Sequence, residues 1–507
     1  MNRREADVLV LGTGAAGARA ASVLASAGLR VVAIEAGGWE PGDHWFAHTL
    51  PRVRRSADEP AARPNEPAPM VNAVGGSNHR SARQSYRLDL DAMPVRWPLT
   101  TVELLPYYAR VEGAVGAEPS PSAPWTETMR AAAGGLGWDT IPAPVATSAP
   151  LGRAELRPLI ESGRLKVLTD TIATELVCDE GGRVIGAEVR RGRATAGEAD
   201  EPAVGSHPAA APGLAVAGRR ERILARRVVL AAHTFENVRL LLLSRSAAHP
   251  DGVGNSTGQV GRGFATHNLL LAHGHFPDRD LARRLSAPGH AVAVVDFDRE
   301  EPRARLDLGA VPTAGATDLV AVPDSLGDVA DFRGGSILQA AMGAADPARI
   351  AAATGLPAEL ADEVGSVWAQ PEQLPRPANR LDLDPSRRDP LGRPLLVATH
   401  DLDDEDRARA DFLLARMEEW LRAAGAARTW RSEVRPNALS THAYGGTVMG
   451  ADPASSVVDS YGEAHDAPGH FVLGASTFPG TGGRGPTETI EALAWRTADR
   501  IVEEIAS

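Results

Sequence analysis

Two glycine-rich segments near opposite ends of the 507-residue chain carry the clearest chemical signals. The first extends from Gly12 to Gly17, and the second extends from Ser440 to Gly450 and contains His442. A glycine-rich turn at a helix N-terminus binds phosphate through backbone N–H groups, so the first segment predicts a phosphate site. Histidine exchanges protons near neutral pH, so the second segment predicts a general acid or base.

The first segment lies at a predicted strand-to-helix turn. The apolar run Asp7–Leu11 is typical of a central strand in a parallel sheet. Gly12 allows a tight turn, Gly14 allows backbone amides to approach a pyrophosphate, and Gly17 allows the helix to pack closely on the strand. The predicted phosphate contacts are Gly12, Gly14, Ala15, Ala16 and Gly17.

The next elements complete a dinucleotide-binding pattern. An alanine-rich helix is expected over Ala18–Leu29, and a second buried strand over Leu29–Ile34. Glu35 follows this strand, where its carboxylate can accept hydrogen bonds from a ribose diol, and Ala36 is a further predicted contact. Strand, glycines, helix, strand and acid in this order indicate an adenine dinucleotide and leave NAD and FAD open.

A last helix is predicted from Pro486 to about Glu504, after a lead-in containing Gly482, Gly483 and Gly485. Proline suits the first helical position, because its missing N–H needs no partner there. The positive end of such a helix, under the pyrimidine edge of a flavin, would stabilise the negative charge that hydride acceptance creates. An ordinary packing helix remains the alternative.

The middle of the chain, roughly residues 276–436, combines alternating strand patterns with an amphipathic helix over Glu405–Ala423. It contains no glycine-rich nucleotide motif, so a substrate-facing or cap domain is expected there. Residues 192–220 are low-complexity Ala, Gly and Pro between two strand-like segments, and we expect a mobile insertion in a hairpin connection.

Composition narrows the class of protein. With 43% apolar and 23% charged residues, the chain is globular rather than disordered, collagenous or a disulfide scaffold. The net charge of −12 gives no bias toward nucleic acid and is compatible with a cationic substrate. Cys178 is the single cysteine, so no internal disulfide exists and no metal site is expected. No apolar stretch is long enough to span a membrane and no signal peptide is recognised, so we expect a cytoplasmic protein.

Taken together, these segments resemble the glucose–methanol–choline (GMC) family of FAD-dependent oxidoreductases, particularly its sugar and polyol dehydrogenase branch. The resemblance covers most of the chain and is clearest at both ends. The matching stretches are Gly12–Gly38, Val74–His79, Trp97–Leu99 with Leu105–Tyr108, Ala231–Ser244, Gly254–Arg262, Asn379–Leu383 with Asp389–Gly392, and His442–Ala494.

The resemblance implies an α/β fold. It has a Rossmann-type FAD-binding domain, like those of GMC enzymes and p-hydroxybenzoate hydroxylase, and an α+β substrate domain built on an antiparallel sheet. The expected FAD-binding domain is discontinuous and comprises residues 1–90, 155–275 and 437–507. Residues 91–154 and 276–436 are expected to form the substrate-binding or cap domain.

The resemblance also implies FAD contacts beyond the first turn. These contacts are Val74, Gly75, Gly76, Asn78 and His79 near the flavin, Ala173 near the adenine, and Ala231, Gly474, Ala475, Gly485, Pro486 and Thr487 along the rest of the cofactor. Some relatives carry FAD covalently on a histidine shortly after the Gly-Gly-Ser motif. His79 lies one residue earlier than that position, so covalent and non-covalent binding both stay open.

His442 matches the family's active-site histidine, which accepts the alcohol proton while the carbon-bound hydrogen leaves as hydride to flavin N5. The implied substrate is a CH–OH group of a sugar, aminosugar or polyol. The implied electron acceptor is oxygen, a quinone or a redox protein, and no nucleic acid partner is expected.

Two positions depart from the family pattern, Gly485 and His233. Gly485 stands where an asparagine or histidine should assist catalysis, so Arg484, a water or another loop must replace that side chain. The missing side chain also leaves open a lyase or isomerase that keeps its flavin without net oxidation. A non-catalytic flavin-binding protein is a further alternative. His233 replaces a glycine and either lines the cofactor cavity or faces solvent, while His267 matches a family position that looks structural.

Overall fold

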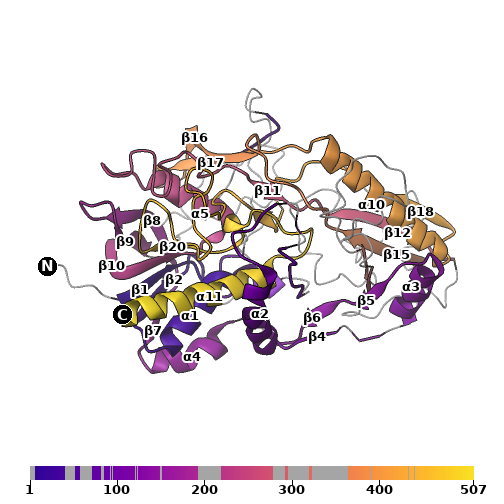
Figure 1. The fold of residues 1–507 in the computed structure, drawn as a ribbon, viewed down its shortest axis with the longest axis horizontal. Helices are drawn as coiled ribbons and strands as arrows, with labels where there is room; N and C mark the ends of the chain where they lie inside the picture. Colours follow the sequence, from indigo (N-terminus) through magenta and orange to yellow (C-terminus); the bar gives the residue numbers. More distant parts are fainter. Residues whose placement is uncertain are drawn as a thin grey trace, which may run out of the picture.

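The computed structural model describes residues 6–39, 52–56, 71–80, 85–91, 93, 95–119, 121–122, 124–148, 151–191, 219–277, 292–294, 319–322, 363–389, 391–431, 433–438 and 440–507. Two sheets lie side by side in an elongated molecule (Figure 1). Both termini lie at the end that holds the first sheet.

The first sheet has seven strands in the order β7-β2-β1-β10-β9-β8, with β20 also paired to β10. The strand β10 joins the parallel part of this sheet to its antiparallel part. Its first residues pair antiparallel with β9, and its last residues pair parallel with β1 and β20. The strands are β1 (Ala6–Leu11), β2 (Val31–Ile34), β7 (Leu165–Leu168), β8 (Thr171–Cys178), β9 (Val184–Arg191), β10 (Arg219–Leu230) and β20 (His470–Val472).

The apolar run of β1 explains its central place. Val8 and Val10 pack into one core cluster, while Leu9 and Leu11 pack into another on the opposite face. Successive side chains of a strand alternate between faces, so a continuously apolar run fits a strand covered on both sides.

Helices from both ends of the chain cover this sheet. The helix α11 runs beside α1, which brings the C-terminal segment onto the first glycine turn (Figure 1). The helices of this region are α1 (Ala15–Ser26), α2 (Thr101–Val115), α4 (Arg153–Glu161), α5 (His233–Leu243) and α11 (Thr487–Ala506).

The second sheet has six strands in the order β18-β12-β15-β14-β13-β5, all paired antiparallel. Buried Leu413, Met417 and Trp420 of α10 pack against it. The elements are β5 (Thr140–Pro142), β12 (Leu270–His275), β13 (Val292–Val294), β14 (Leu319–Val322), β15 (Val364–Ala369) and β18 (Arg428–Arg431), with helices α3 (Pro124–Gly135) and α10 (Asp404–Ala423).

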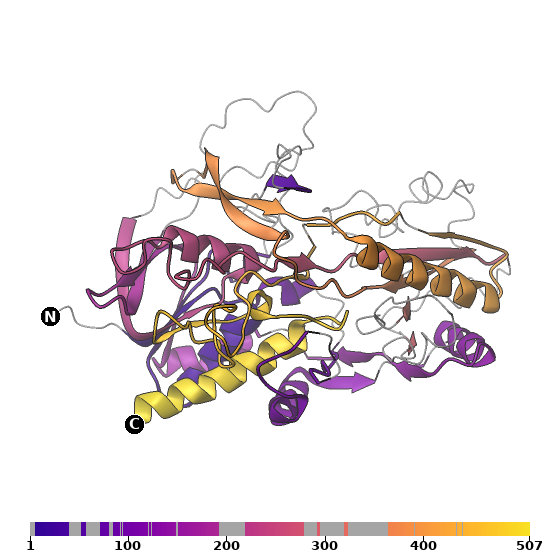
Figure 2. The same cartoon turned by 45° about the horizontal axis from the view of Figure 1, so that its top comes forward.

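The remaining described elements form smaller sheets and two 3₁₀ helices. Figure 2 shows the pair β16–β17 along the upper edge, on the side opposite α11. These elements are β3 (Arg52–Arg54), β4 (Ala117–Pro119), β6 (Pro144–Ala146), β11 (Ala265–Thr266), β16 (Arg380–Arg388), β17 (Pro394–Thr399), β19 (Ala443–Tyr444), η1 (Gly76–Arg80) and η5 (Ala475–Thr477).

The expected α/β fold with a second antiparallel sheet is confirmed. The domain boundaries stay a prediction, and the range 155–275 contributes strands to both sheets because β12 belongs to the second. Of the insertion expected at 192–220, residues 192–218 lie outside the described part, and the last two residues begin β10. Among the described helices, none combines the length and apolar character needed to cross a membrane.

Candidate active site

The first glycine turn is packed as its sequence predicts. A Cβ atom added at Gly12 would lie 2.5 Å from the carbonyl oxygen of Ala231, and one added at Gly17 would lie 1.9 Å from the carbonyl oxygen of Gly12. Gly12 also has a φ of 95°, which favours glycine. Helix α1 begins at Ala15 and continues through Ala16, so the free N–H groups of its first turn lie directly after this loop.

Glu35 ends β2 and turns its carboxylate toward the same loop. Its Oε2 accepts hydrogen bonds from the backbone N–H and the hydroxyl of Thr13, at 3.1 and 2.7 Å, and its Oε1 accepts one from the N–H of Gly37 at 3.0 Å. Burial raises the pKa of Glu35, against the effect of its hydrogen bonds to Thr13, Gly37 and Ala36. These donors hold the carboxylate beside the first glycine turn, where the family pattern expects the ribose of the cofactor.

The segment around Gly75 and Gly76 lies against the first turn. The N–H of Gly75 donates to the carbonyl of Thr13 at 2.8 Å, and a Cβ atom at Gly76 would lie 2.7 Å from the Cα of Gly14. Asn78 donates to Glu491 of α11 at 3.1 Å, and Arg19 of α1 forms an ion pair with the same carboxylate at 2.6 Å. These contacts join η1, α1 and α11.

His79 folds back onto its own turn. Its Nε2 lies 2.7 Å from the carbonyl oxygen of Val74, and since a carbonyl only accepts, this nitrogen carries the hydrogen. The covalent and non-covalent alternatives at His79 are both still predictions.

Residues from β10 and β20 lie beside the first turn. The N–H of Ala231 donates to Leu11 at 2.8 Å, and the N–H of Leu473 donates to Leu230 at 2.8 Å, so Ala231 and Gly474 follow neighbouring strand ends. Ala475 begins η5 directly after Gly474. Ala173 lies further along β8, whose first residue Thr171 donates to the carbonyl of Glu35 at 2.8 Å.

The last predicted contacts lie at the start of α11. The helix begins at Thr487 with Pro486 as its N-cap, one residue later than the sequence predicted. Gly485 precedes the cap, and Arg484 donates its Nη1 to the carbonyl of Arg87 at 3.0 Å. This contact gives Arg484 a partner away from Gly485.

His442 is positioned by a short antiparallel strand pair. In β11 and β19, Thr266 lies opposite Ala443, so the next residues, His267 and His442, also meet. Their Nδ1 atoms are 3.0 Å apart and their rings meet edge to face. Burial lowers the pKa of His442 to about 4, and burial together with the neighbouring imidazole lowers the pKa of His267 well below its ordinary value. Both rings are therefore neutral at neutral pH.

A buried carboxylate continues this contact away from His442. The Nε2 of His267 lies 2.6 Å from the hydroxyl oxygen of Thr481, and that hydroxyl donates to Oε2 of Glu372 at 2.7 Å. The backbone N–H groups of Thr481 and Gly483 also donate to Glu372, at 3.0 and 2.7 Å. Sequence reasoning missed Glu372 and Thr481, and it read His267 as structural.

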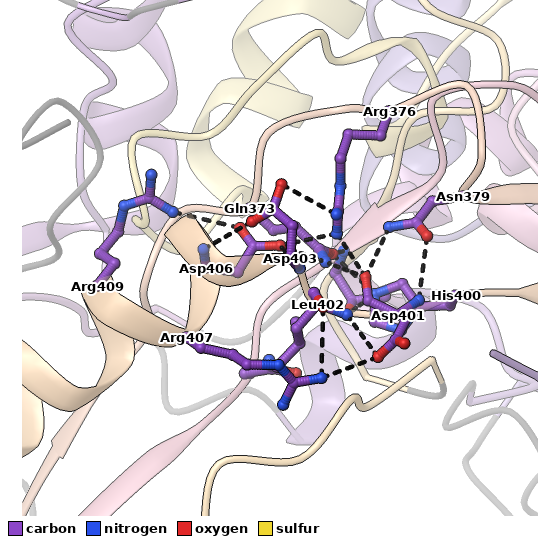
Figure 3. A network of polar contacts seen from close by, with 12 residues as sticks. Gln373, Arg376, Asn379, His400, Asp401, Leu402, Asp403, Asp406, Arg407 and Arg409 are labelled. Atoms are coloured by element: carbon purple, nitrogen blue, oxygen red, sulfur yellow. Dashed lines mark hydrogen bonds and ion pairs between the residues drawn. The ribbon is translucent and has the colours of Figure 1, made fainter. Parts of the chain in front are cut away.

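A polar network holds the segment that carries Glu372 (Figure 3). Arg409 of α10 donates to the carbonyl of Glu372 at 2.7 Å, and Arg376 forms an ion pair with Asp406 of α10 at 2.8 Å. Gln373 accepts a hydrogen bond from the N–H of Thr266 at 3.1 Å, next to His267. The network therefore fixes Glu372 relative to the histidine pair.

His233, the second departure from the family pattern, has a φ of 73°, which is strained for a residue with a side chain. Its ring stacks on Phe235 at 5.5 Å. Its Nδ1 is buried without a hydrogen-bond partner among the described residues. The buried nitrogen favours a cavity-lining position over one that faces solvent.

Two known protein families match this chain. The protein-family model described as FAD binding domain matches residues 7–275, and the family model described as GMC oxidoreductase matches residues 375–494. The chain belongs to the GMC oxidoreductase family. FAD is its cofactor, and it is an FAD-dependent oxidoreductase of the alcohol oxidase and dehydrogenase class.

Relatives of this GMC oxidoreductase extend over nearly the whole chain. It is 29% identical to 6'''-hydroxyparomomycin C oxidase of Streptomyces lividus and 28% identical to paromamine 6'-oxidase of Streptomyces fradiae, each over 99% of this chain and 92% of the relative. The structure of pyridoxine 4-oxidase from Mesorbium loti matches with a TM-score of 0.65 at 18% identity, covering 97% of this chain and 98% of that one. This last match supports the fold alone.

The residues of the GMC oxidoreductase fit FAD. A Cβ atom at Gly14, Gly474 or Gly485 would meet no protein atom within 4 Å, whereas one at Gly12 or Gly17 would collide with backbone. Among the glycines expected to contact FAD, Gly14, Gly474 and Gly485 therefore leave space beside the backbone, whereas Gly12 and Gly17 are also required for packing of the turn. Among the described residues, no group of three or more His, Cys, Asp or Glu side chains is placed to hold a metal ion.

Proposed function

We propose that this GMC oxidoreductase oxidises an alcohol of an aminosugar or related sugar to a carbonyl, with His442 as the general base. The observation that carries the proposal is the placement of neutral His442 beside the turn of Ala475, whose carbonyl accepts the N–H of Gly445 at 3.1 Å. The two Streptomyces relatives are named for oxidation of aminosugar compounds. The net charge of −12 is compatible with a cationic substrate.

In the mechanism, bound FAD supplies the acceptor for the hydride that leaves the alcohol carbon. His442 accepts the hydroxyl proton on its free ring nitrogen, which lets the C–O bond become a carbonyl as the hydride departs. Gly12, Gly14, Gly17, Glu35 and the N-terminus of α11 are the groups proposed to hold the cofactor. The substrate's two hydrogens are thus divided between His442 and the cofactor.

The alternative of a lyase or isomerase was based on the missing side chain at Gly485. The two Streptomyces relatives, both named as oxidases, favour oxidation over this alternative.

Anaerobic mixing tests the proposal. Purified enzyme is mixed with paromamine, glucosamine and glucose in the absence of oxygen, and the flavin absorbance is followed. Bleaching by paromamine, with glucosamine preferred over glucose, supports oxidation of an aminosugar. Conversion of a substrate while the flavin stays oxidised throughout would instead establish non-oxidative chemistry.

A further inference from the structure

Four polar side chains from separate segments form a line that ends at His442. Glu372 follows β15, Thr481 follows η5, His267 follows β11, and His442 precedes β19. The successive contacts are 2.7, 2.6 and 3.0 Å long. Glu372, Thr481 and His267 are at most 2% exposed, so water does not compete for these hydrogen bonds.

The direction of each hydrogen bond follows from the carboxylate of Glu372, which lies at the end of the line opposite His442. The Glu372 carboxylate already accepts two backbone N–H groups, from Thr481 and Gly483, so it acts as an acceptor and the Thr481 hydroxyl must donate to it. The hydroxyl oxygen of Thr481 then accepts from Nε2–H of His267.

The same logic continues through the two rings. A neutral imidazole has one N–H and one bare nitrogen. With Nε2 protonated, His267 presents a bare Nδ1, which accepts a hydrogen bond from Nδ1–H of His442. His442 is then left with a bare Nε2, the form that can accept a proton.

We propose that Glu372, Thr481 and His267 are positioning residues that hold His442 in its Nδ1–H tautomer, with Nε2 free to act as the base. This inference rests on the proposed function.

The opposite direction of these hydrogen bonds would leave His442 without a free nitrogen to act as the base. If Glu372 were protonated, it would donate to Thr481, Thr481 to His267, and His267 to His442. His442 would then carry its hydrogen on Nε2 and could not accept the alcohol proton. The charged group that faces Glu372 is Arg409, and the neighbouring Tyr444 stays neutral because burial raises its pKa well above the ordinary value.

Nuclear magnetic resonance of protein labelled with ¹⁵N-histidine tests the tautomer without substrate. The His442 signals are assigned by their loss in His442→Asn. We expect hydrogen on Nδ1 and a bare Nε2 in the native protein, and a mixture of tautomers in Thr481→Val. Hydrogen on Nε2 of His442 in the native protein overturns the proposal.

Flavin reduction provides the second readout. Thr481→Val removes the central hydroxyl and leaves its two buried partners unsatisfied, which should slow anaerobic flavin reduction by about 10- to 100-fold, and Thr481→Ser should restore the rate. Thr497→Val is the matched control, because the Thr497 hydroxyl is also buried and donates to Tyr461 at 2.7 Å on the distal half of α11. Equal rates in Thr481→Val and Thr497→Val contradict the proposal.

If Thr481→Val does not fold, Glu372→Gln replaces it, because loss of the anion should also let the second tautomer appear. The two proposals fail separately. A preparation with the expected tautomer that oxidises no alcohol refutes the function and leaves the arrangement of the rings, whereas an active enzyme with the opposite tautomer refutes only the positioning role.

Discussion

The first glycine turn and the line from Glu372 to His442 solve two different problems. The turn presents backbone N–H groups, and its glycines keep side chains out of the way. The line uses four side chains of specific chemistry, and each must meet the next within hydrogen-bond distance. Backbone chemistry is set by local conformation, whereas side-chain chemistry depends on how distant segments pack.

The two regions also differ in what supports them. The turn is supported by strand and helix packing around Gly12 and Gly17. Glu372 lies in the segment between β15 and β16 and depends on the ion-pair network with α10 (Figure 3). Changes in the turn should therefore affect cofactor retention and stability, while changes along the line should affect the rate of proton removal.

The largest effect is expected at His442. His442→Ala removes the base, so anaerobic flavin reduction should slow by about 10²- to 10⁴-fold, with little change in the substrate concentration needed for half-maximal rate. Stopped-flow absorbance measures both quantities. Flavin bleaching at the native rate would refute the assignment of His442.

A glycine pair separates packing from cofactor contact in the first turn. In Gly17→Ala the new Cβ collides with backbone, so the free energy of unfolding should fall by about 1–3 kcal/mol and FAD should be lost. In Gly14→Ala the new Cβ meets no protein atom, so the apoprotein should keep its stability while FAD affinity falls.

Thermal unfolding of the apoproteins and FAD titration distinguish these outcomes. Native FAD affinity in Gly14→Ala would show that the cofactor does not approach this residue.

A smaller effect is expected from substitution of Arg409, the cation beside Glu372. Burial raises the pKa of Glu372, and the hydrogen bonds from Thr481 and Gly483 together with the positive charge of Arg409 oppose this rise. Arg409→Met should therefore raise that pKa, so that Glu372 takes up a proton at a higher pH and the line reverses. The acid limb of the flavin-reduction rate should move to higher pH.

The matched control is Arg407→Met on the same helix, which breaks an exposed ion pair with Asp401. Its acid limb should stay at the native pH. An unmoved limb in Arg409→Met would mean that the charge of Glu372 does not influence the rate.

Much of the first region could be predicted from the sequence. The order of β1, the glycine turn, α1, β2 and Glu35 follows from local signals that lie within one continuous stretch. The final helix was also predictable, with its start misplaced by one residue because proline fits both the cap and the first turn.

The second region could be predicted only in part. His442 was marked by its glycine-rich surroundings and by family resemblance, and Thr481 lies beside glycines that drew attention for another reason. Glu372 has no local signal, because its role arises from contact between the segment that joins β15 to β16 and the segment that follows η5. The pairing of His267 with His442 depends on the register of β11 and β19, which no local pattern encodes.

The pH dependence of anaerobic flavin reduction tests the central claim, that His442 accepts the alcohol proton, most directly. Because burial lowers the pKa of His442 to about 4, the rate should stay constant near neutral pH and fall at acid pH, where protonation of the His442 ring removes the base. Protonation of Glu372, whose pKa burial raises, should contribute to the same acid limb. This limb should be absent from the residual rate of His442→Ala. The same limb in the variant and in the native enzyme would contradict the account.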